Sequence, residues 1–192
     1  QNISDVSSAA SSEATSTTAS SESTGDAAQE LTFVLSNIPD GLDPSVTNNS
    51  FAQYVLINCF EGLVTYDSTG TLVPGNAESW DISDDGLTYT FHLRDGLKWS
   101  DGSDLTAEDY VYTIQRVLTP ATAAQYVSMA TDYIKNAQEY YDGTATADDL
   151  GVKALDDKTL EITLVQPTSY FIDILSMWTF SPVQKATVEA NG

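Results

Sequence analysis

"ESWDISDDGLTYTFHLR", residues 78–94, predicts a β-hairpin and thereby decides the fold of this 192-residue chain. Tyr89, Phe91 and Leu93 alternate with polar residues, which is the period of a strand that buries one face. The segment "SDDG" at 83–86 carries the Asp and Gly residues that a tight turn requires. We therefore expect an antiparallel strand pair against which neighbouring segments pack.

The segment that follows, "DGLKWSDG" at 95–102, places two Asp-Gly turns around Trp99. Turns this close to an aromatic residue indicate either a rigid corner or an acidic ligand site. Beyond them, Thr106 and Asp109 have the spacing of a capping box, which marks the start of a helix. The apolar residues at helical spacing in this helix are Tyr110, Val111, Ile114, Val117 and Leu118.

Helical and strand patterns alternate irregularly along the rest of the chain. They comprise a strand at 31–37, a helix from Ser50 to Gly62, a short strand followed by a turn and an exit loop at 63–75, a helix at 131–143, a hairpin at 152–165, a helix at 168–180 and a helical start at 183–192. Asn48, Asn49 or Ser50 could each cap the helix that begins near Ser50. This mixture predicts an α+β or mixed α/β fold.

The composition excludes two classes of partner. Lys and Arg total seven against 28 Asp and Glu, which gives a net charge of −21, and the first basic residue is Arg94. Such a surface repels phosphates and anionic lipid headgroups, so neither nucleic-acid binding nor direct adhesion to an acidic membrane is expected. Apolar runs also fall short of the roughly 20 residues that a membrane-spanning helix needs.

The first 30 residues have a different composition from the rest. Residues 1–30 are mostly Ser, Thr and Ala and contain no base and no aromatic residue, so they cannot bury enough apolar surface to offset the entropy of ordering. We expect a disordered tether. Cys59, the single cysteine, lies in the apolar segment "YVLINCF" at 54–60, which predicts a buried structural thiol.

Candidate catalytic and metal-binding residues have simpler structural explanations. Asp81 to His92 has part of the spacing of a calcium-binding loop, but the final position is His where a bidentate Glu is needed. His92, the only histidine, has no suitably spaced nucleophile or second ligand beside it. The paired acids fall in turns and helix starts, where carboxylates accept backbone N–H groups. The sequence therefore predicts no catalytic residue, metal site or cofactor.

Several segments together resemble a known family. They are "GLDP" (41–44), "CFEGLVTYD" (59–67), "LVPGNAESWDISDDGLTYTFHLRDGLKWSDGSDLTAEDYVYTIQRVLTP" (72–120), "DLGVKALDDKTLEITLVQPTSYF" (149–171) and "FSPVQK" (180–185). The chain is similar to the extracellular solute-binding proteins, family 5, of peptide ABC importers, and most similar to their oligopeptide-binding branch. The resemblance implies a two-lobed fold like that of periplasmic binding proteins, and it makes the segment around Trp99 a corner of the scaffold.

The resemblance also implies a function and a set of site residues. Members of the family capture peptides outside the membrane and deliver them to a membrane permease, with the peptide extended and its backbone paired to the protein backbone. On this chain, Asn48, Asn49 and Ser50 match the loop that contacts the peptide. Tyr126 matches a ligand-facing aromatic residue, although packing within the scaffold would explain it equally well.

The same resemblance divides the chain into regions. It implies a tether at 1–30, the start of the larger lobe at 31–60, the smaller lobe at 61–166 and a return into the larger lobe at 167–192, with the opposite wall of the ligand cleft encoded beyond Gly192. The acidic tether is typical of the spacer that follows a lipidated cysteine in Gram-positive lipoproteins. A periplasmic location is the alternative.

Other functions remain open at this level. The ligand could be a dipeptide, a nickel chelate, haem or a signalling peptide, which residues outside this chain would decide. A surface sensor or adhesin built on the same scaffold is a rival from another class. A hydrolase that depends on His92 is a third and weaker reading.

Overall fold

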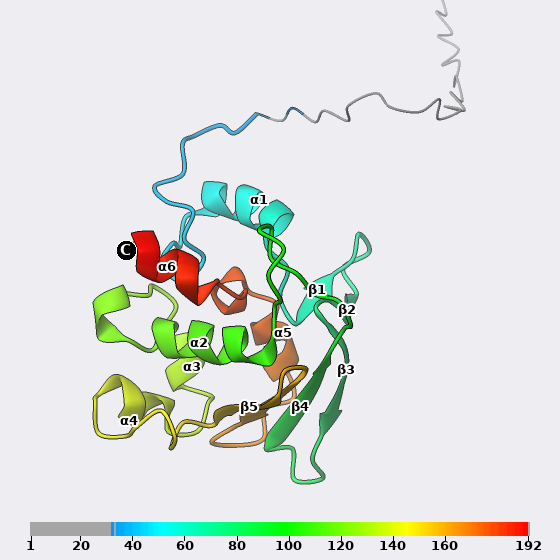
Figure 1. Ribbon diagram of the computed structural model, residues 1–192, viewed down its shortest axis with the longest axis vertical. Helices are drawn as coiled ribbons and strands as arrows, with labels where there is room; N and C mark the ends of the chain where they lie inside the picture. Colours follow the sequence, from blue (N-terminus) through cyan, green and yellow to red (C-terminus); the bar gives the residue numbers. More distant parts are fainter. Residues whose placement is uncertain (1–31, 33, 192) are drawn as a thin grey trace, which may run out of the picture. The chain divides into compact units, whose positions relative to one another are not determined.

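The structure, a computed structural model, describes Thr32 and residues 34–191 (Figure 1). The predicted tether at 1–30 lies outside the described residues, and Leu35–Gly192 form a unit of their own. The helices are α1 (Ser50–Cys59), α2 (Ala107–Val117), α3 (Ser128–Thr131), α4 (Ala137–Tyr141), α5 (Phe171–Leu175) and α6 (Lys185–Asn191), with 3-10 turns η1 (Pro120–Thr122) and η2 (Trp178–Phe180). The strands are β1 (Val64–Tyr66), β2 (Leu72–Pro74), β3 (Ala77–Ile82), β4 (Thr88–Leu93), β5 (Val152–Asp156) and β6 (Thr159–Thr163).

Strands β3 and β4 form the hairpin that the sequence predicts. Tyr89, Phe91 and Leu93 are buried, whereas the residues between them are half-buried. The apolar residues of the alternating pattern therefore lie on the buried face of the strand, and the polar residues lie on the other face. In the turn, Gly86 adopts a left-handed backbone (φ 70°), which glycine does without steric cost. The 78–94 hairpin is therefore confirmed.

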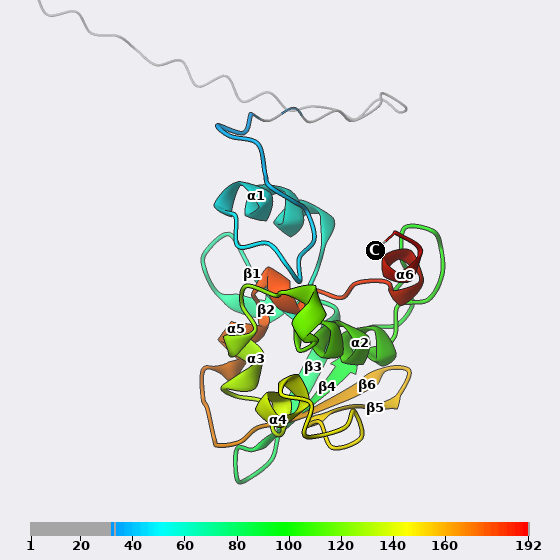
Figure 2. The same cartoon turned by 90° about the vertical axis from the view of Figure 1, so that its left-hand side faces the viewer.

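The second predicted hairpin, β5 with β6, completes a four-stranded antiparallel sheet with the order β3-β4-β6-β5 (Figure 2). Its turn lies at Asp156–Asp157, as predicted, and the Asp156 carboxylate accepts the backbone N–H of Lys158 at 2.8 Å. Strands β1 and β2 pair separately as a small hairpin. Helices and antiparallel strands are thus mixed in the way the sequence predicts.

Helix α2 packs on the sheet at β5 and β6, and it lies next to β5 in Figure 1. It begins with the predicted capping box, in which the backbone N–H of Thr106 donates to the Asp109 carboxylate at 2.8 Å. All five residues of the predicted apolar stripe are buried. Four of them lie within the helix, and Leu118 follows its last residue. The buried apolar residues of this interface belong to the hydrophobic core.

The segment around Trp99 forms a corner between β4 and α2. The Asp101 carboxylate accepts the backbone N–H of Ser103 at 2.9 Å and its hydroxyl at 2.6 Å, and its other oxygen accepts the side-chain amide of Gln184 at 2.7 Å. Lys98 pairs with Asp104 across the same turn. The carboxylates of Asp101 and Asp104 thus bond to neighbouring residues of the protein. This agrees with the scaffold corner that the resemblance implies.

The predicted continuous helix at 131–143 is wrong, because tertiary pairing interrupts it. The backbone N–H of Lys135 donates to Thr163 at 2.9 Å, and Gly151 donates to the carbonyl of Lys135 at 2.9 Å. These hydrogen bonds use groups that a helix would have paired internally, and Asn136 then takes a left-handed backbone (φ 58°). Within 131–143 only the last residue of α3 and the whole of α4 are helical.

Two other predicted elements differ from the structure. The helix at 168–180 is broken after α5, because Met177 has an extended backbone (φ −70°, ψ 141°) before η2. Of the strand at 31–37, Leu31 and Phe33 lie outside the described residues, and residues 34–37 are not in a strand. A strand needs a neighbour to complete its ladder, and the part of the chain described here pairs none with this segment.

The prediction that Cys59 is buried is also wrong. Helix α1 buries Ala52 and Leu56, whereas Tyr54 is 56% exposed and Ile57 is 60% exposed. Cys59 is the last residue of α1, beyond the turn that contacts the core, and its thiol is exposed. Within the described residues, the helices are all too short or too polar to span a bilayer.

We predict that Gly151→Ala destabilises the fold by about 1–3 kcal/mol, because the structure cannot absorb the added carbon without shifting backbone. A Cβ at this position would lie 2.7 Å from the carbonyl oxygen of Thr163 and 2.8 Å from the Cβ of Lys135. Urea unfolding monitored by tryptophan fluorescence measures the change. Gly41→Ala is the matched control, since nothing lies within 4 Å of its Cβ, and it should change the free energy of unfolding by less than about 1 kcal/mol.

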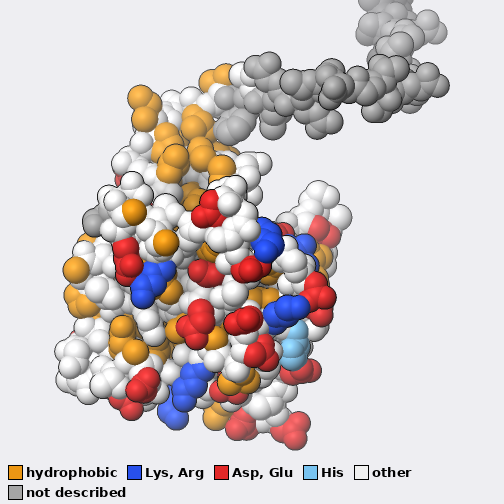
Figure 3. Space-filling model, in the orientation of Figure 1, with side chains coloured by type: hydrophobic (Ala, Val, Ile, Leu, Met, Phe, Trp, Pro, Cys, Tyr) orange, Lys and Arg blue, Asp and Glu red, His pale blue; other side chains and the backbone are white. Residues whose placement is uncertain are grey.

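A second prediction concerns acid pH, because the turn aspartates are hydrogen-bonded in the folded state. Acidic side chains are spread over the face shown in Figure 3. The pKa is lowered by side-chain or backbone hydrogen bonds at Asp67, Asp85, Asp95, Asp101, Asp149 and Asp156. For Asp101, hydrogen bonds from Ser103 and then Gln184 lower the pKa from 3.8 to about 2.

Between pH 3.8 and about 2 the folded state therefore binds fewer protons at Asp101 than the unfolded state does. Stability that is fully present above this range is lost as the pH falls through it. The melting temperature should decline less steeply over this range in Asp101→Asn than in the wild type. Asp84→Asn is the control, because the Asp84 carboxylate accepts no hydrogen bond from the described residues. Equal slopes for all three proteins would contradict the prediction.

Candidate functional site

The loop that precedes α1 is a compact turn organised by Asp43. Its carbonyl oxygen accepts the backbone N–H groups of Val46 at 3.2 Å and Thr47 at 3.0 Å. Its carboxylate accepts the backbone N–H of Ser45 at 3.0 Å. Pro44, Ser45 and Thr47 are buried, so the loop is packed against the protein along most of its length.

Arg116, near the C-terminal end of α2, fixes the start of this loop. Its two terminal nitrogens donate to the two carboxylate oxygens of Asp43, at 2.8 and 2.5 Å. The side chain of Arg116 is 17% exposed and that of Asp43 is 39% exposed, so water screens the pair only in part. The hydrogen bond that Arg116 donates to Asp43 is the largest cause of the raised pKa of Arg116, and burial opposes it.

Thr47 fixes the other end of the loop. Its hydroxyl donates to Asp40 at 3.1 Å and accepts the backbone N–H of Asn49 at 3.1 Å. Its carbonyl oxygen accepts the indole N–H of Trp178 at 3.1 Å. Tyr126 in turn packs edge-on against Trp178, with the ring centres 5.6 Å apart.

The three predicted loop residues have different environments. Asn49 is the N-cap of α1, because its side-chain oxygen accepts the backbone N–H groups of Phe51 at 2.8 Å and Ala52 at 3.3 Å. Ser50 is the exposed first residue of that helix. Asn48 is exposed, and neither its backbone N–H nor its carbonyl bonds to any described residue. A free donor and acceptor therefore lie on a fixed loop.

A shallow hollow of about 360 Å³ lies beside this loop. It is lined by Asp40, Gly41, Asp43, Val46, Thr47, Asn48 and Gln125. Of the four predicted site residues, only Asn48 lines it, while Tyr126 follows Gln125 in sequence and is half-buried against Trp178. The structure thus brings the 48 loop and the 125–126 segment to one region, with Asn49 and Ser50 turned into α1.

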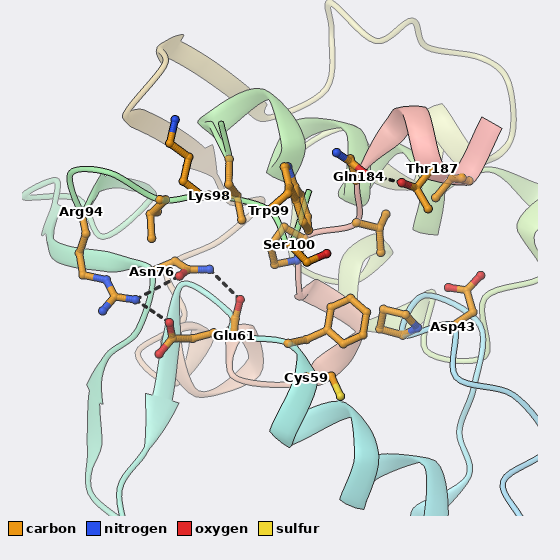
Figure 4. A pocket seen from close by; sticks show the side chains of 17 residues that line it. Asp43, Cys59, Glu61, Asn76, Arg94, Lys98, Trp99, Ser100, Gln184 and Thr187 are labelled. Carbon is orange, nitrogen blue, oxygen red and sulfur yellow. Dashed lines mark hydrogen bonds and ion pairs between the residues drawn. The ribbon is translucent and has the colours of Figure 1, made fainter. Parts of the chain in front are cut away.

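A larger pocket of about 610 Å³ lies between the end of α1, the corner and the start of α6 (Figure 4). Its polar side chains are mostly engaged with the protein. Asn76 donates to the backbone carbonyl of Glu61 at 2.8 Å and to the Tyr110 hydroxyl at 2.9 Å, and Arg94 pairs with Glu61 at 2.5 Å. Among the buried polar side-chain atoms of this lining, the indole N–H of Trp99 has no hydrogen-bond partner in the described residues.

This larger pocket contains none of the predicted site residues Asn48, Asn49, Ser50 and Tyr126. Its walls are largely apolar, with Phe60, Leu97 and Val183 among them. Apart from the indole N–H of Trp99, the buried polar side-chain atoms of the lining are already bonded to neighbours. We therefore take the 43–50 loop with its shallow hollow as the candidate functional site.

Three residues of the site were not identified from the sequence. They are Arg116 and Trp178, which hold the loop, and Thr47, whose carbonyl accepts the indole N–H of Trp178. Trp178 lies 131 residues after Thr47 in the chain, so spacing gives no sign of this contact. Arg116, one of only two arginines in an acidic chain, was a signal that could have been used. Among the described residues, there is no group of His, Cys, Asp and Glu suited to holding a metal ion.

Comparison with known proteins gives consistent matches. Residues 71–192 match the family model described as "Bacterial extracellular solute-binding proteins, family 5 Middle". The chain is 43% identical over 155 residues to the probable deoxycholate-binding periplasmic protein YgiS of Escherichia coli strain K12, covering 80% of the chain and 29% of YgiS. It is 42% identical over 168 residues to the periplasmic oligopeptide-binding protein OppA of the same strain, covering 86% of the chain and 31% of OppA.

The fold is similar to solved structures as well. The crystal structure of the periplasmic oligopeptide-binding protein OppAIV from Borrelia burgdorferi matches with a TM-score of 0.78 and 46% identity, over 80% of this chain and 31% of that one. The chain thus spans between 29% and 31% of the length of these relatives. The matches confirm the resemblance found in the sequence, and the chain belongs to family 5 of the bacterial extracellular solute-binding proteins.

Proposed function

We propose that this chain is part of the substrate-binding component of an ABC-type peptide importer, which captures oligopeptides outside the cytoplasmic membrane and delivers them to a membrane permease. Family membership supports the proposal, as do relatives whose names are those of oligopeptide-binding proteins. The role is binding and delivery, and it requires no catalytic residue or cofactor.

The observation that carries the proposal is the state of the Asn48 backbone. Its N–H and carbonyl have no partner among the described residues, although the loop on both sides is hydrogen-bonded and packed. A peptide that binds in an extended conformation pairs its own backbone with such groups, much as an added strand would. Backbone pairing also makes binding tolerant of peptide sequence, which suits an importer of mixed peptides.

We propose that the regions predicted from the sequence are the lobes of the complete receptor. Residues 31–60 and 167–192 would belong to the larger lobe and 61–166 to the smaller one. The hydrogen bond from Trp178 to Thr47 supports this, because it joins the two segments assigned to the larger lobe. The pair of Arg116 with Asp43 would then connect the smaller lobe to the larger.

The location follows from the same proposal. The relatives include proteins named periplasmic, so we place this protein outside the cytoplasm. The acidic segment 1–30 would act as a tether from a lipid anchor on a Gram-positive cell surface, with a periplasmic location as the alternative. The partners would be the peptide and the permease.

Receptors for other ligands are the second candidate. YgiS is named a probable deoxycholate-binding protein, and it is 43% identical to this chain over 155 residues. A bile acid is therefore the non-peptide ligand to test first. Dipeptides, nickel chelates, haem and signalling peptides remain alternatives, as does a sensor or adhesin without a permease.

We predict that the protein produced from its complete gene binds tetra-alanine with micromolar or tighter affinity, because four peptide units can pair with exposed backbone without side-chain selection. Isothermal titration calorimetry measures this. A parallel calorimetric titration with deoxycholate tests the second candidate, a receptor for a non-peptide ligand. Tighter binding of deoxycholate than of any peptide in a mixed library would contradict the peptide proposal.

The 192-residue chain alone should show negligible affinity for the same peptide. A concave site normally buries most of its ligand, and the described loop offers one wall with a shallow hollow of about 360 Å³. Micromolar binding of tetra-alanine to this chain by calorimetry would refute the expectation that the opposite wall is encoded elsewhere.

A further inference from the structure

The loop before α1 is held at two points by side chains from separate elements. We propose that Arg116 and Trp178 are positioning residues for peptide binding, which fix the Asp43–Thr47 turn so that the Asn48 peptide groups are presented in a set orientation. The proposal rests on the proposed function, since it assigns these residues to the same peptide-binding loop.

Arg116 acts on the start of the loop. The guanidinium donates to both carboxylate oxygens of Asp43, at 2.8 and 2.5 Å, so it sets the orientation of that carboxylate as well as its position. The carboxylate and carbonyl of Asp43 then accept the backbone N–H groups of Ser45, Val46 and Thr47. A lysine at this position could not reproduce the two parallel hydrogen bonds.

Trp178 acts on the end of the loop. Its indole N–H is the one described donor to the carbonyl of Thr47, whose residue is 6% exposed. The contact is possible because Met177 is extended, which ends α5 and directs the chain toward the loop. Tyr126 packs edge-on against the indole and supports its orientation. The Thr47 carbonyl that Trp178 contacts and the N–H of Asn48 belong to the same peptide group.

The physical consequence is preorganisation. Ordering a loop at the moment of binding reduces affinity, whereas a loop that is already ordered does not incur this cost. Within the 43–47 turn, the backbone N–H groups of Ser45, Val46 and Thr47 are already bonded to Asp43 before any ligand arrives, whereas the backbone groups of Asn48 have no partner among the described residues. Loosening either anchor should therefore weaken peptide binding more than it weakens the fold.

Two conservative variants test the proposal in the protein produced from its complete gene. Trp178→Phe removes the indole N–H and keeps an aromatic ring beside Tyr126. Arg116→Lys keeps the positive charge and removes the pair of parallel hydrogen bonds to Asp43. We expect each to raise the dissociation constant for tetra-alanine about three- to tenfold. The melting temperature should fall by no more than a few degrees. Trp80→Phe and Arg94→Lys are matched controls outside the loop, and we expect less than a threefold change in affinity for both.

Amide hydrogen exchange of the free protein gives a readout that does not depend on a ligand. The amides of Val46 and Thr47, which donate to Asp43, should exchange slowly in the wild type and faster in Arg116→Lys and Trp178→Phe. The Asn48 amide should exchange freely until tetra-alanine is added. Protection that appears at Asn48 with the peptide supports the proposal.

The outcomes separate the two levels of inference. A wild type that binds tetra-alanine, together with variants whose affinity changes less than threefold, overturns the positioning role and leaves the proposed function intact. A wild type that binds no peptide overturns the proposed function. The exchange rates of Val46 and Thr47 still decide whether the anchors fix the loop, and equal rates in wild type and variants overturn that as well.

Discussion

Strand β4 is the element on which the rest of the structure depends. It pairs with β3 on one side and with β6 on the other, and one of its faces carries the buried residues Tyr89, Phe91 and Leu93. Because side chains alternate along a strand, a shift of one residue would move this face into water. Because β4 pairs with β6, its register also sets the position of the strands on which α2 packs, and α2 carries Arg116 to the loop.

The parts of the fold that were predicted from the sequence are those specified by local chemistry. The two hairpins have alternating strands and acid-rich turns, and α2 has a capping box, so residues close in sequence determine each. The interruption of the predicted helix at 131–143 could not be foreseen, because it depends on hydrogen bonds between Lys135 and the distant residues Gly151 and Thr163. The exposure of Cys59 likewise depends on which face of α1 meets the core.

The candidate site follows the same division. The resemblance indicated Asn48, Asn49, Ser50 and Tyr126, and whether they contact a peptide stays a prediction. The capping role of Asn49 was among the options that local spacing allowed. The contact of Trp178 with Thr47 could not be read from spacing, since it joins segments 131 residues apart and depends on a break at Met177.

The exposed thiol of Cys59 has a practical consequence. It is the only cysteine of the chain, and it lies at the C-terminal end of the helix whose first turn Asn49 caps. With a rise of about 1.5 Å per residue, that end is roughly 15 Å along the helix axis from the loop. A maleimide dye or a nitroxide could thus be attached at one defined point without mutagenesis, close enough to report spectroscopically on changes near Asn48.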